Sequence, residues 1–515
     1  MAEQQADTNT RGGGRAGRRE RKRATGPKII AGIERKIPVY DVFGDDQLSL
    51  IEQNIDALLE NVGVEIRGDE GSLELWRNAG ADVKGERIRF PPGLVRKIIK
   101  ENAPSQFTHH ARNPARSVMI GEDRMVFVPI YGPPFIRNVE EGRRYANIED
   151  FKNFVKLAYA TPWLHHSGGV VCEPVDIPVN KRHLDMVYNH LRLSDKPFLG
   201  SIITKERAED SIAMARLVFG DEFVANNCVI MGNVNVNSPL VFDGEVTRVM
   251  RTYARANQGM VIAPFILGGA MGPVSTIGAV TQAVAEGMVG IALCQLERPG
   301  APVILGNFLS SMNLRSGAPT FGTPEPVLGS MIVGQLARRL GVPLRCSGAF
   351  TTSKVADGQA MAESANSINA AVLCGAHFVL HSAGWLEGGL VSGYEKFMMD
   401  ADQLGALHTF IEGFTLTDND FALDAFEEVQ PGGHFFGCAH TMANYETAFW
   451  ESSIADNNSF EQWRDEGEHD ALYRANKNWK KLLEDYEAPH MDEAVDEALQ
   501  EFVTTRKNAM DDMWY

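Results

Sequence analysis

The chain is poor in cysteine and has no paired cysteine spacing. Its 515 residues include six cysteines and no C-x-x-C pair; they stand at positions 172, 228, 294, 346, 374 and 438. A set this sparse and scattered does not predict a disulfide framework or a redox motif. We therefore expect a reduced, intracellular setting and a cytoplasmic protein.

Two further absences narrow the class of protein. No apolar run reaches the 18 or so residues of a membrane span, so we expect no transmembrane helix and no membrane partner. Positive charge is in deficit, with 50 Lys and Arg against 67 Asp and Glu, a net charge of −17 and a pI near 5.3. Phosphate contacts need a basic surface, so this balance argues against nucleic acid. Hydrophobic residues at 44% and charged residues at 23% are typical of a soluble globular protein.

Nucleotide and metal motifs are missing too. Glycine-rich stretches at 268–272 and 384–389 match neither the G-x-G-x-x-G pattern nor the phosphate-binding P-loop. The closest local cluster of metal ligands is His434, Cys438 and His440, with Cys172 and Cys346 near expected strand ends. Because zinc needs three or four ligands at matched spacing, we predict no metal site and interpret these histidines as hydrogen-bonded packing residues.

Eight short apolar runs do recur, roughly 30 to 45 residues apart, each followed by room for one helix. Buried parallel strands appear as continuous apolar runs because helices cover both faces of their sheet. The pattern predicts an α/β protein with a closed (β/α)8 barrel, a TIM barrel, whose active site lies at the carboxyl ends of its strands. The runs are Arg124–Ile130, Trp163–Val171, Pro197–Ile203, Cys228–Val236, Gly259–Gly269, Pro302–Phe308, Pro343–Ala349 and Ala376–Gly384.

Composition divides the rest of the chain. Residues 1–28 are rich in Arg and almost devoid of large apolar side chains, which predicts a disordered basic tail. Residues 29–115 are mostly helical in pattern and predict an N-terminal helical cap, with helices at 47–62 and 93–102. Residues 116–395 form the predicted barrel domain. Residues 396–515 predict a C-terminal helical extension that packs on the barrel or on a second subunit.

Polar residues at the strand ends are the candidates for chemistry. Arg345 stands inside the seventh apolar run, where a buried guanidinium needs a partner: either a substrate carboxylate or a structural salt bridge. His381 ends the eighth run, a position that in barrels favours function. We predict a catalytic role for His381 and Glu387 and a substrate-binding role for Arg345 and His381. Asp357 and Glu363 are further candidates.

Aromatic residues follow several of the same runs. Tyr131 and Phe135 follow the first, Phe350 follows the seventh, and Trp385 and Tyr394 follow the eighth. Rings that converge on one barrel mouth can hold a methylated ammonium ion by cation–π attraction, at roughly 0.5–2 kcal/mol each. We predict that Phe350, Trp385, Tyr131 and Phe135 bind substrate in this way. Singly, each ring could equally fill the core or the rim.

Four stretches of the chain resemble the trimethylamine methyltransferase family, the corrinoid-dependent methylamine methyltransferases. The resemblance spans about residues 33–483, and its most specific stretches are TFGTPEP (Thr320–Pro326), FTTSKVADGQAMAES (Phe350–Ser364), GAHFVLHSAGWLEGGLVSGYEKFMMD (Gly375–Asp400) and GGHFFGCAHT (Gly432–Thr441). Members are (β/α)8 barrels, as the apolar runs independently predict. The resemblance implies methyl transfer from a methylated amine to the Co(I) corrinoid (cobalamin) of a separate partner protein. No tightly bound cofactor is expected, and the enzyme is expected to be a homo-oligomer.

The sequence also departs from part of that family. Archaeal trimethylamine enzymes of the family carry pyrrolysine, and no such residue is visible here. The glycine betaine branch lacks it as well, and Arg345 and His381 are similar to that branch's substrate-site Arg and His. The resemblance thus implies a quaternary amine such as glycine betaine, with its carboxylate on Arg345. The alternatives are trimethylamine itself, a zinc-dependent methyl transfer to a thiol, and a barrel that binds betaine without turnover.

Overall fold

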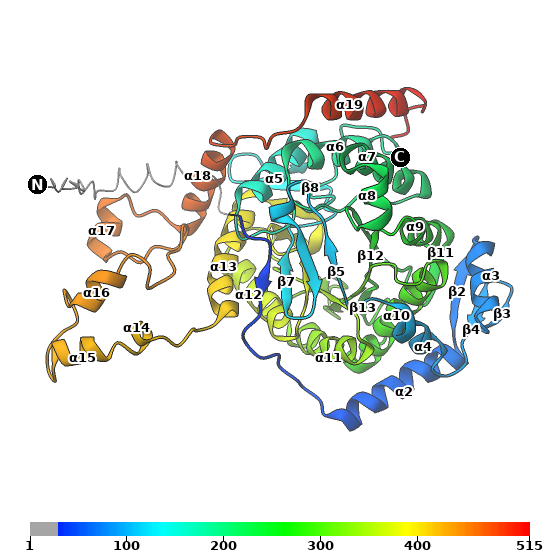
Figure 1. Cartoon of the computed structure of the whole chain (residues 1–515), viewed down its shortest axis with the longest axis horizontal. Coiled ribbons are helices and arrows are strands. Elements are labelled where there is room, and N and C mark those ends of the chain that lie inside the picture. Colours follow the sequence, from blue (N-terminus) through cyan, green and yellow to red (C-terminus); the bar gives the residue numbers. More distant parts are fainter. Residues whose placement is uncertain (1–28, 515) are drawn as a thin grey trace, which may run out of the picture.

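The computed structural model describes residues 29–514, and the predicted basic tail at 1–28 lies outside them. A ring of parallel strands forms the centre of the fold (Figure 1). Six are regular: β7 (Arg124–Phe127), β10 (Met231–Val234), β12 (Gly259–Ile262), β14 (Val303–Gly306), β17 (Leu344–Ser347) and β18 (Phe378–Leu380). Two are extended segments at 165–168 and 197–200.

Backbone hydrogen bonds close these strands into a ring. β18 pairs in parallel with β7, and Leu199 bridges Met231 of β10. The two irregular segments complete the circle, because His165 N donates to Phe127 O over 3.0 Å and Leu199 N donates to Gly168 O over 2.7 Å. All eight predicted apolar runs therefore supply barrel strands in the predicted order, and the (β/α)8 fold is confirmed.

One helix follows each strand and covers the outside of the ring. The helices are α5 (Ile148–Ala160), α6 (Arg182–Leu193), α7 (Lys205–Phe219), α9 (Gly244–Arg255), α10 (Thr276–Glu297), α11 (Pro324–Leu340), α12 (Gly358–Leu373) and α13 (Tyr394–Glu412), with a short α8 (Asp221–Asn226) after α7. By length and mean hydropathy of 1.6, α10 alone among the described helices could cross a membrane. Because 83% of its most apolar window is buried inside the protein, α10 is interpreted as a core helix.

The inside of the barrel is closed at its amino end. A hairpin of β5 (Gln106–His109) and β6 (Val118–Gly121) lies there, and Val118 and Ile120 pack against inward side chains of the strands. Those inward side chains, all buried, include Val126, Val128, Leu199, Met231, Val261, Ile304, Phe378 and Leu380. A packed interior leaves the opposite, carboxyl end as the place for a site.

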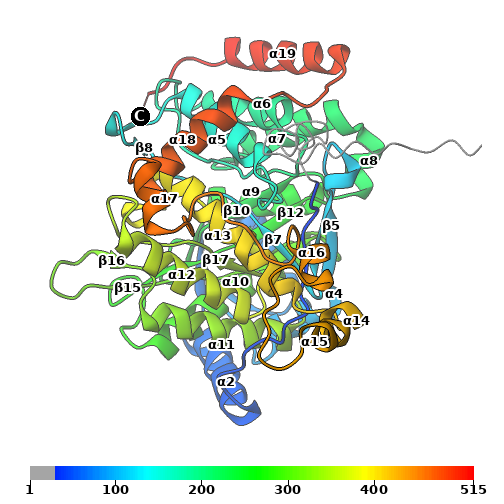
Figure 2. The same ribbon diagram turned by 90° about the vertical axis from the view of Figure 1, so that its left-hand side faces the viewer.

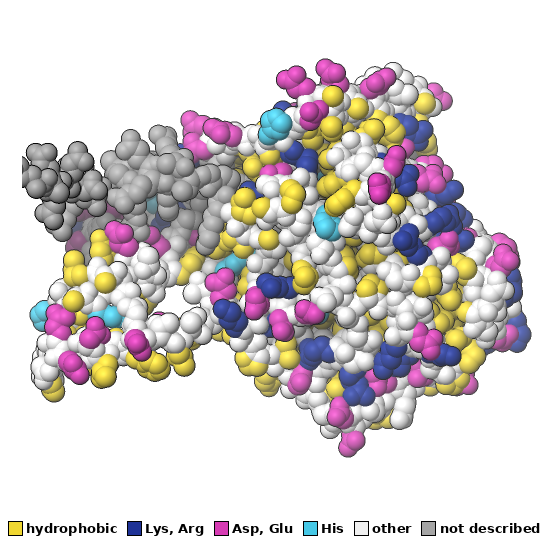
Figure 3. All heavy atoms as spheres, in the orientation of Figure 1, with side chains coloured by type: hydrophobic (Ala, Val, Ile, Leu, Met, Phe, Trp, Pro, Cys, Tyr) yellow, Lys and Arg dark blue, Asp and Glu magenta, His cyan; other side chains and the backbone are white. Residues whose placement is uncertain are grey.

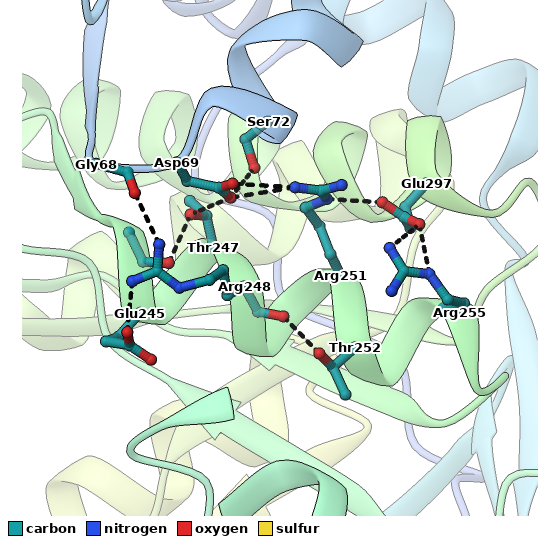
Figure 4. A network of polar contacts seen from close by, with 11 residues as sticks. Gly68, Asp69, Ser72, Glu245, Thr247, Arg248, Arg251, Thr252, Arg255 and Glu297 are labelled. Atoms are coloured by element: carbon teal, nitrogen blue, oxygen red, sulfur yellow. Dashed lines mark hydrogen bonds and ion pairs between the residues drawn. The ribbon is translucent and has the colours of Figure 1, made fainter. Parts of the chain in front are cut away.

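The N-terminal segment contains strands as well as helices. α2 (Asp45–Asn61), α3 (Glu70–Asn78) and α4 (Leu94–Asn102) accompany a small sheet of β2 (Val64–Arg67), β3 (Asp82–Lys84) and β4 (Arg87–Arg89), which β11 (Val241–Asp243) extends. Polar contacts fasten it to the barrel helices, since Asp69 accepts from Ser72, Thr247 and Arg251 (Figure 4). Burial would raise the pKa of Asp69, but these hydrogen bonds and the charge of Arg251 lower it overall.

Two small sheets rise at the carboxyl ends of the strands and form a rim. One joins β8 (Phe135–Asn138) and β9 (Gly142–Tyr145) to β19 (Trp385–Leu386) and β20 (Val391–Gly393). The other consists of β13 (Phe265–Gly268), β15 (Phe308–Met312) and β16 (Pro319–Thr320). In Figure 2, β15 and β16 stand at the left edge of the molecule.

The C-terminal part beyond α13 is helical, as predicted. It contains α14 (Asp418–Phe421), α15 (Leu423–Val429), α16 (Ala439–Asn444), α17 (Phe460–Asp465), α18 (Ala471–Glu484) and α19 (Glu493–Asn508). α18 packs on α13 and α5, and α19 packs on α6 and α7. α14 to α16 instead project from the body (Figure 1). The predicted domain boundaries stay predictions; the one at 395 falls in the first turn of α13.

Candidate active site

Arg345 is the buried charge at the carboxyl end of the barrel. It is the second residue of β17 and is fully buried. Its Nη1 donates to the main-chain oxygen of Asn307 over 2.7 Å and its Nη2 to Nδ1 of His381 over 2.9 Å. Its Nε has no hydrogen-bond partner among residues 29–514. Burial lowers the pKa of Arg345 to about 10, and no carboxylate of the described chain offsets this.

His381 faces Arg345 from the next strand. β17 and β18 are hydrogen-bonded in parallel, and His381 follows β18 directly. Burial, and then the charge of Arg345, hold the pKa of His381 well below its usual value, although a hydrogen bond with the Tyr131 main chain works the other way. Since Nδ1 accepts the Arg345 hydrogen bond, the ring is neutral with an unprotonated Nδ1. His381 also has a φ of 64°, a strained backbone for a residue with a side chain.

Aromatic rings cover this pair on the side of the mouth. The rings of Phe350 and Trp385 lie 5.1 Å and 4.6 Å from that of His381, and 4.2 Å from each other. The Phe308 ring lies 5.6 Å from His381 and 5.0 Å from the guanidinium carbon of Arg345. Phe350 and Trp385 are buried and Phe308 is half-buried, so Phe308 lies on the accessible side of the cluster. We call Arg345, His381, Phe308, Phe350 and Trp385 the Arg345 cluster.

The side chains of the other predicted site residues pack outside the Arg345 cluster. Tyr131 contributes its main chain to His381, while its ring packs against Leu199 and Gly169. Phe135 lies on β8, with the Tyr145 ring 4.4 Å away and the Arg143 guanidinium 3.6 Å away. Glu387 pairs with the same Arg143 over 2.9 Å. The structure thus groups Phe135 and Glu387 on the rim sheet, apart from the contacts of the Arg345 cluster.

Three further candidates support the loops of the fold. Asp357 caps the start of α12 by accepting from Ala360 N over 2.9 Å. Glu363 accepts from Thr351 Oγ1 and Thr352 N over 2.6 Å and 2.8 Å. Thr351 O in turn accepts from Trp385 Nε1 over 3.1 Å, so Glu363 acts on the cluster indirectly. Tyr394 donates to Asp150 outside the barrel.

A buried ion pair lies beneath the segment 381–385. Lys396 and Asp400, one turn apart on α13, are both fully buried and in contact. Lys396 Nζ also donates to Ser364 Oγ over 2.8 Å, and Asp400 accepts from Gly384 N over 2.9 Å. Burial raises the pKa of Asp400 to about 6, despite the neighbouring ammonium. Asp400 therefore holds the backbone between His381 and Trp385.

His434, Cys438 and His440, the closest local cluster of possible metal ligands in the sequence, form no metal-binding group in the described structure. Within residues 29–514, no three His, Cys, Asp or Glu side chains come together in a way that could hold a metal ion. His440 bonds the main-chain oxygen of Asn419 over 2.8 Å, and Cys438 bonds Thr441.

Four residues in or around the Arg345 cluster were not selected from the sequence. Phe308 and Asn307 end the sixth apolar run, so the strand-end rule that selected His381 would also have selected them. Lys396 and Asp400 carried a weaker signal, an i, i+4 pair of opposite charge on one helix.

The chain matches a known protein family and several known proteins. The trimethylamine methyltransferase (MTTB) family matches residues 11–511. A glycine betaine methyltransferase of Desulfitobacterium hafniense (strain Y51) is 38% identical over 471 residues, which cover 91% of this chain and 98% of that protein. The chain belongs to the trimethylamine methyltransferase family. It is therefore a methyltransferase.

Other proteins that the chain resembles are more distant. The trimethylamine methyltransferase MttB of Desulfitobacterium hafniense (strain DSM 10664 / DCB-2) is 25% identical, over 90% of this chain and 93% of that protein. The solved monomethylamine methyltransferase of Methanosarcina barkeri covers 88% of this chain with 13% identity and a TM-score of 0.45, covering 97% of its own length. Because this similarity is low, the barrel fold of the chain rests on its own strands.

Proposed function

We propose that this methyltransferase takes a methyl group from a quaternary amine bearing a carboxylate, with glycine betaine favoured, and passes it to the Co(I) corrinoid of a partner protein. The observation that carries the substrate class is the fully buried guanidinium of Arg345. Among the described residues it has neither an acceptor for its Nε nor an acidic partner. A buried charge of this kind is costly unless it is paired. A substrate carboxylate supplies both the negative charge and the missing acceptor.

The aromatic rings suit the other end of such a substrate. Trimethylammonium carries a permanent charge and no N–H donor, so ring faces attract it better than hydrogen-bond acceptors do. Phe308, beside the guanidinium and half-buried, is the ring that this ligand meets first. Because Phe350 and Trp385 pack closely on His381, entry of the ligand requires these side chains to change rotamer, as is common on binding.

No proton has to move in this reaction. The electron pair of the broken N–CH3 bond stays on nitrogen, and a neutral tertiary amine leaves. The reduced cobalt of the partner's corrinoid supplies the nucleophile when it is bound. The chain's own residues orient the substrate, which agrees with a neutral His381 that positions Arg345 and with a Glu387 paired to Arg143.

The rim fits a broad acceptor. Around β13 and β15, Val274 and Leu314 are each 72% exposed, and Leu328 is 49% exposed. Exposed apolar side chains at the end of the barrel that carries the Arg345 cluster suit the docking of another protein's cofactor face. This supports a partner that approaches from the carboxyl ends of the strands.

A substrate panel tests the proposal. Glycine betaine, trimethylamine, tetramethylammonium and carnitine would each be offered with a reduced corrinoid protein, and methyl transfer followed by the corrinoid's absorbance. We expect turnover with glycine betaine well above that with trimethylamine. Turnover with trimethylamine alone would refute the substrate class and favour the second candidate, trimethylamine, for which the 25% identical relative speaks.

A further inference from the structure

The segment 414–449, which contains α14, α15 and α16 and which we call the arm, exposes apolar side chains at a density found nowhere else in the described chain. Phe414 is 98% exposed, Phe449 89%, Phe436 87%, Phe421 62% and Phe426 60%. At ~200 Å² for each ring, these five phenylalanines alone offer on the order of 800 Å² of apolar surface to water. Leu416, Leu423 and Met442 add to it.

The arm holds its own shape without drawing these rings inward. Asn419 donates to Asn444 over 3.1 Å, His440 bonds Asn419 O over 2.8 Å, and Ala439 N donates to Glu428 over 3.0 Å. The root of the arm is tied to the body, since Ser453 N and Oγ donate to Asp402 of α13 over 2.7 Å and 2.9 Å. The arm is therefore a built element whose rings point outward, and Figure 3 shows its apolar and acidic side chains side by side.

We propose that a second copy of this chain covers the arm, so that two arms pack on one another about a two-fold axis. A stable interface buries about 800 Å² on each partner, which the arm's phenylalanines already supply. A two-fold contact needs a self-complementary surface, and an apolar patch is self-complementary. This proposal names the surface behind the expected homo-oligomer and is independent of which amine the enzyme uses.

The position of the arm argues against the corrinoid partner as its occupant. An acceptor of the methyl group must reach the barrel mouth, where β15 and β16 stand. In Figure 2, β15 and β16 lie at the left edge and α14 and α15 at the right. A protein seated on the arm would therefore sit at the wrong end to receive a methyl group from the Arg345 cluster.

The charge of the arm gives the association a signature. The arm has no Lys or Arg, and its acidic residues are Asp418, Asp420, Asp424, Glu427, Glu428 and Glu446. Two such arms bring like charges to the rim of their contact. Salt screens that repulsion, so the dimer tightens as ionic strength rises.

Sedimentation and light scattering of the full chain test the proposal. We expect the mass of at least two chains for the wild type, and single chains for a variant with Phe414→Ser, Phe436→Ser and Phe449→Ser, its dissociation constant raised by about 100-fold. The matched control, Tyr40→Ser, Leu50→Ser and Leu217→Ser, changes three exposed apolar residues of the body and keeps the wild-type mass. Circular dichroism identifies a variant that has unfolded.

Each contrary result overturns the proposal. A single-chain wild type at high protein concentration removes the dimer, and an arm variant of wild-type mass places the interface elsewhere. If the arm variant misfolds, the wild type alone tests the proposal. Raising the salt concentration from about 50 to about 500 mM must then strengthen the association of its chains. Weaker association at high salt would refute the arm-to-arm contact. The substrate panel would still test the proposed function, because it does not depend on the dimer.

Discussion

Nη2 of Arg345 donates to Nδ1 of His381 across 2.9 Å, and this contact defines the charge state of the His381 ring. The donor is permanently protonated, so His381 must be the acceptor, and its ring stays neutral while the contact persists. The pair therefore presents one positive charge to the barrel mouth and no acidic proton. Such a site can hold an anion but has no general acid among these two residues.

Arg345 should separate carboxylated from non-carboxylated substrates. For Arg345→Met we expect kcat/KM to fall about 100-fold with glycine betaine, since hydrogen bonds to a charged group contribute ~1.5–3 kcal/mol each. With tetramethylammonium the change should stay within about threefold. Steady-state kinetics on both substrates measure this, and equal losses would remove the carboxylate role.

The same Arg345→Met variant should fold at least as stably as the wild type. Among the described residues Arg345 has no acidic partner, so Arg345→Met removes a costly buried charge without leaving a carboxylate unpaired, although the main-chain oxygen of Asn307 and Nδ1 of His381 each lose a donor. Thermal unfolding without substrate checks this. A large fall in Tm would show that the guanidinium is a structural element and not one held ready for a ligand.

Phe308 should act through its ring face. Phe308→Leu keeps an apolar side chain but removes the ring that lies over Arg345, and we expect KM for a quaternary amine to rise roughly 3- to 30-fold, from ~0.5–2 kcal/mol. Phe308→Tyr should stay near wild type. Phe223→Leu, at a half-exposed phenylalanine of α8, serves as the control. A loss in the Tyr variant equal to that in the Leu variant would mean that packing, not the ring face, matters.

The Lys396–Asp400 pair should show the asymmetry of buried ions. Lys396→Met leaves a buried carboxylate alone and should cost about 3–5 kcal/mol in urea unfolding. The double variant Lys396→Met, Asp400→Asn keeps an acceptor for Gly384 N and should recover most of that loss. Lys152→Met, which breaks a partly exposed pair with Glu149, should cost less than about 1 kcal/mol. A double variant as unstable as the single one would contradict this account.

Acid should weaken the fold through its buried histidines. Burial lowers the pKa of His377 to about 4 from an ordinary 6.5; its Nδ1 accepts from Leu344 N and its Nε2 bonds Glu122 O. Below pH 6.5, His377 takes up a proton in the unfolded chain but stays neutral in the folded chain. The free energy of unfolding therefore falls as the pH drops from 6.5 to 4. The full loss is about 3 kcal/mol for this residue. His377→Gln should flatten that part of the curve in urea unfolding, and an unchanged slope would exclude His377 as the source.

The barrel could be predicted because its signal is local. Each strand is covered by helices, so each is a short apolar run, and eight such runs survive even where the segments at 165–168 and 197–200 are too irregular to form regular strands. The sheet in the N-terminal segment could not be predicted in the same way. β2, β3 and β4 are three or four residues long, too short to show the alternation of a strand.

The candidate site was predictable only where it follows the strand-end rule. Arg345 lies in β17 and His381 directly follows β18, and the parallel register of these two strands brings their side chains together. Phe135 and Glu387 also follow strands, yet the rim sheet carries them to Arg143. The order of residues along the chain does not show which of them reach the Arg345 cluster and which reach Arg143. A loop that follows a barrel strand can fold back over the barrel mouth or fold outward from it.

The sequence by itself determined the family, the order of the barrel strands and the end of the barrel at which to look, because periodicity and motif are properties of contiguous residues. Only the tertiary structure decided that Arg345 is buried beside His381 with no acid next to it in residues 29–514, and that the phenylalanines of the arm face water. Charge pairing and exposure depend on which distant segments meet. That outcome depends on the packing of the whole chain and is not written in any one stretch of it.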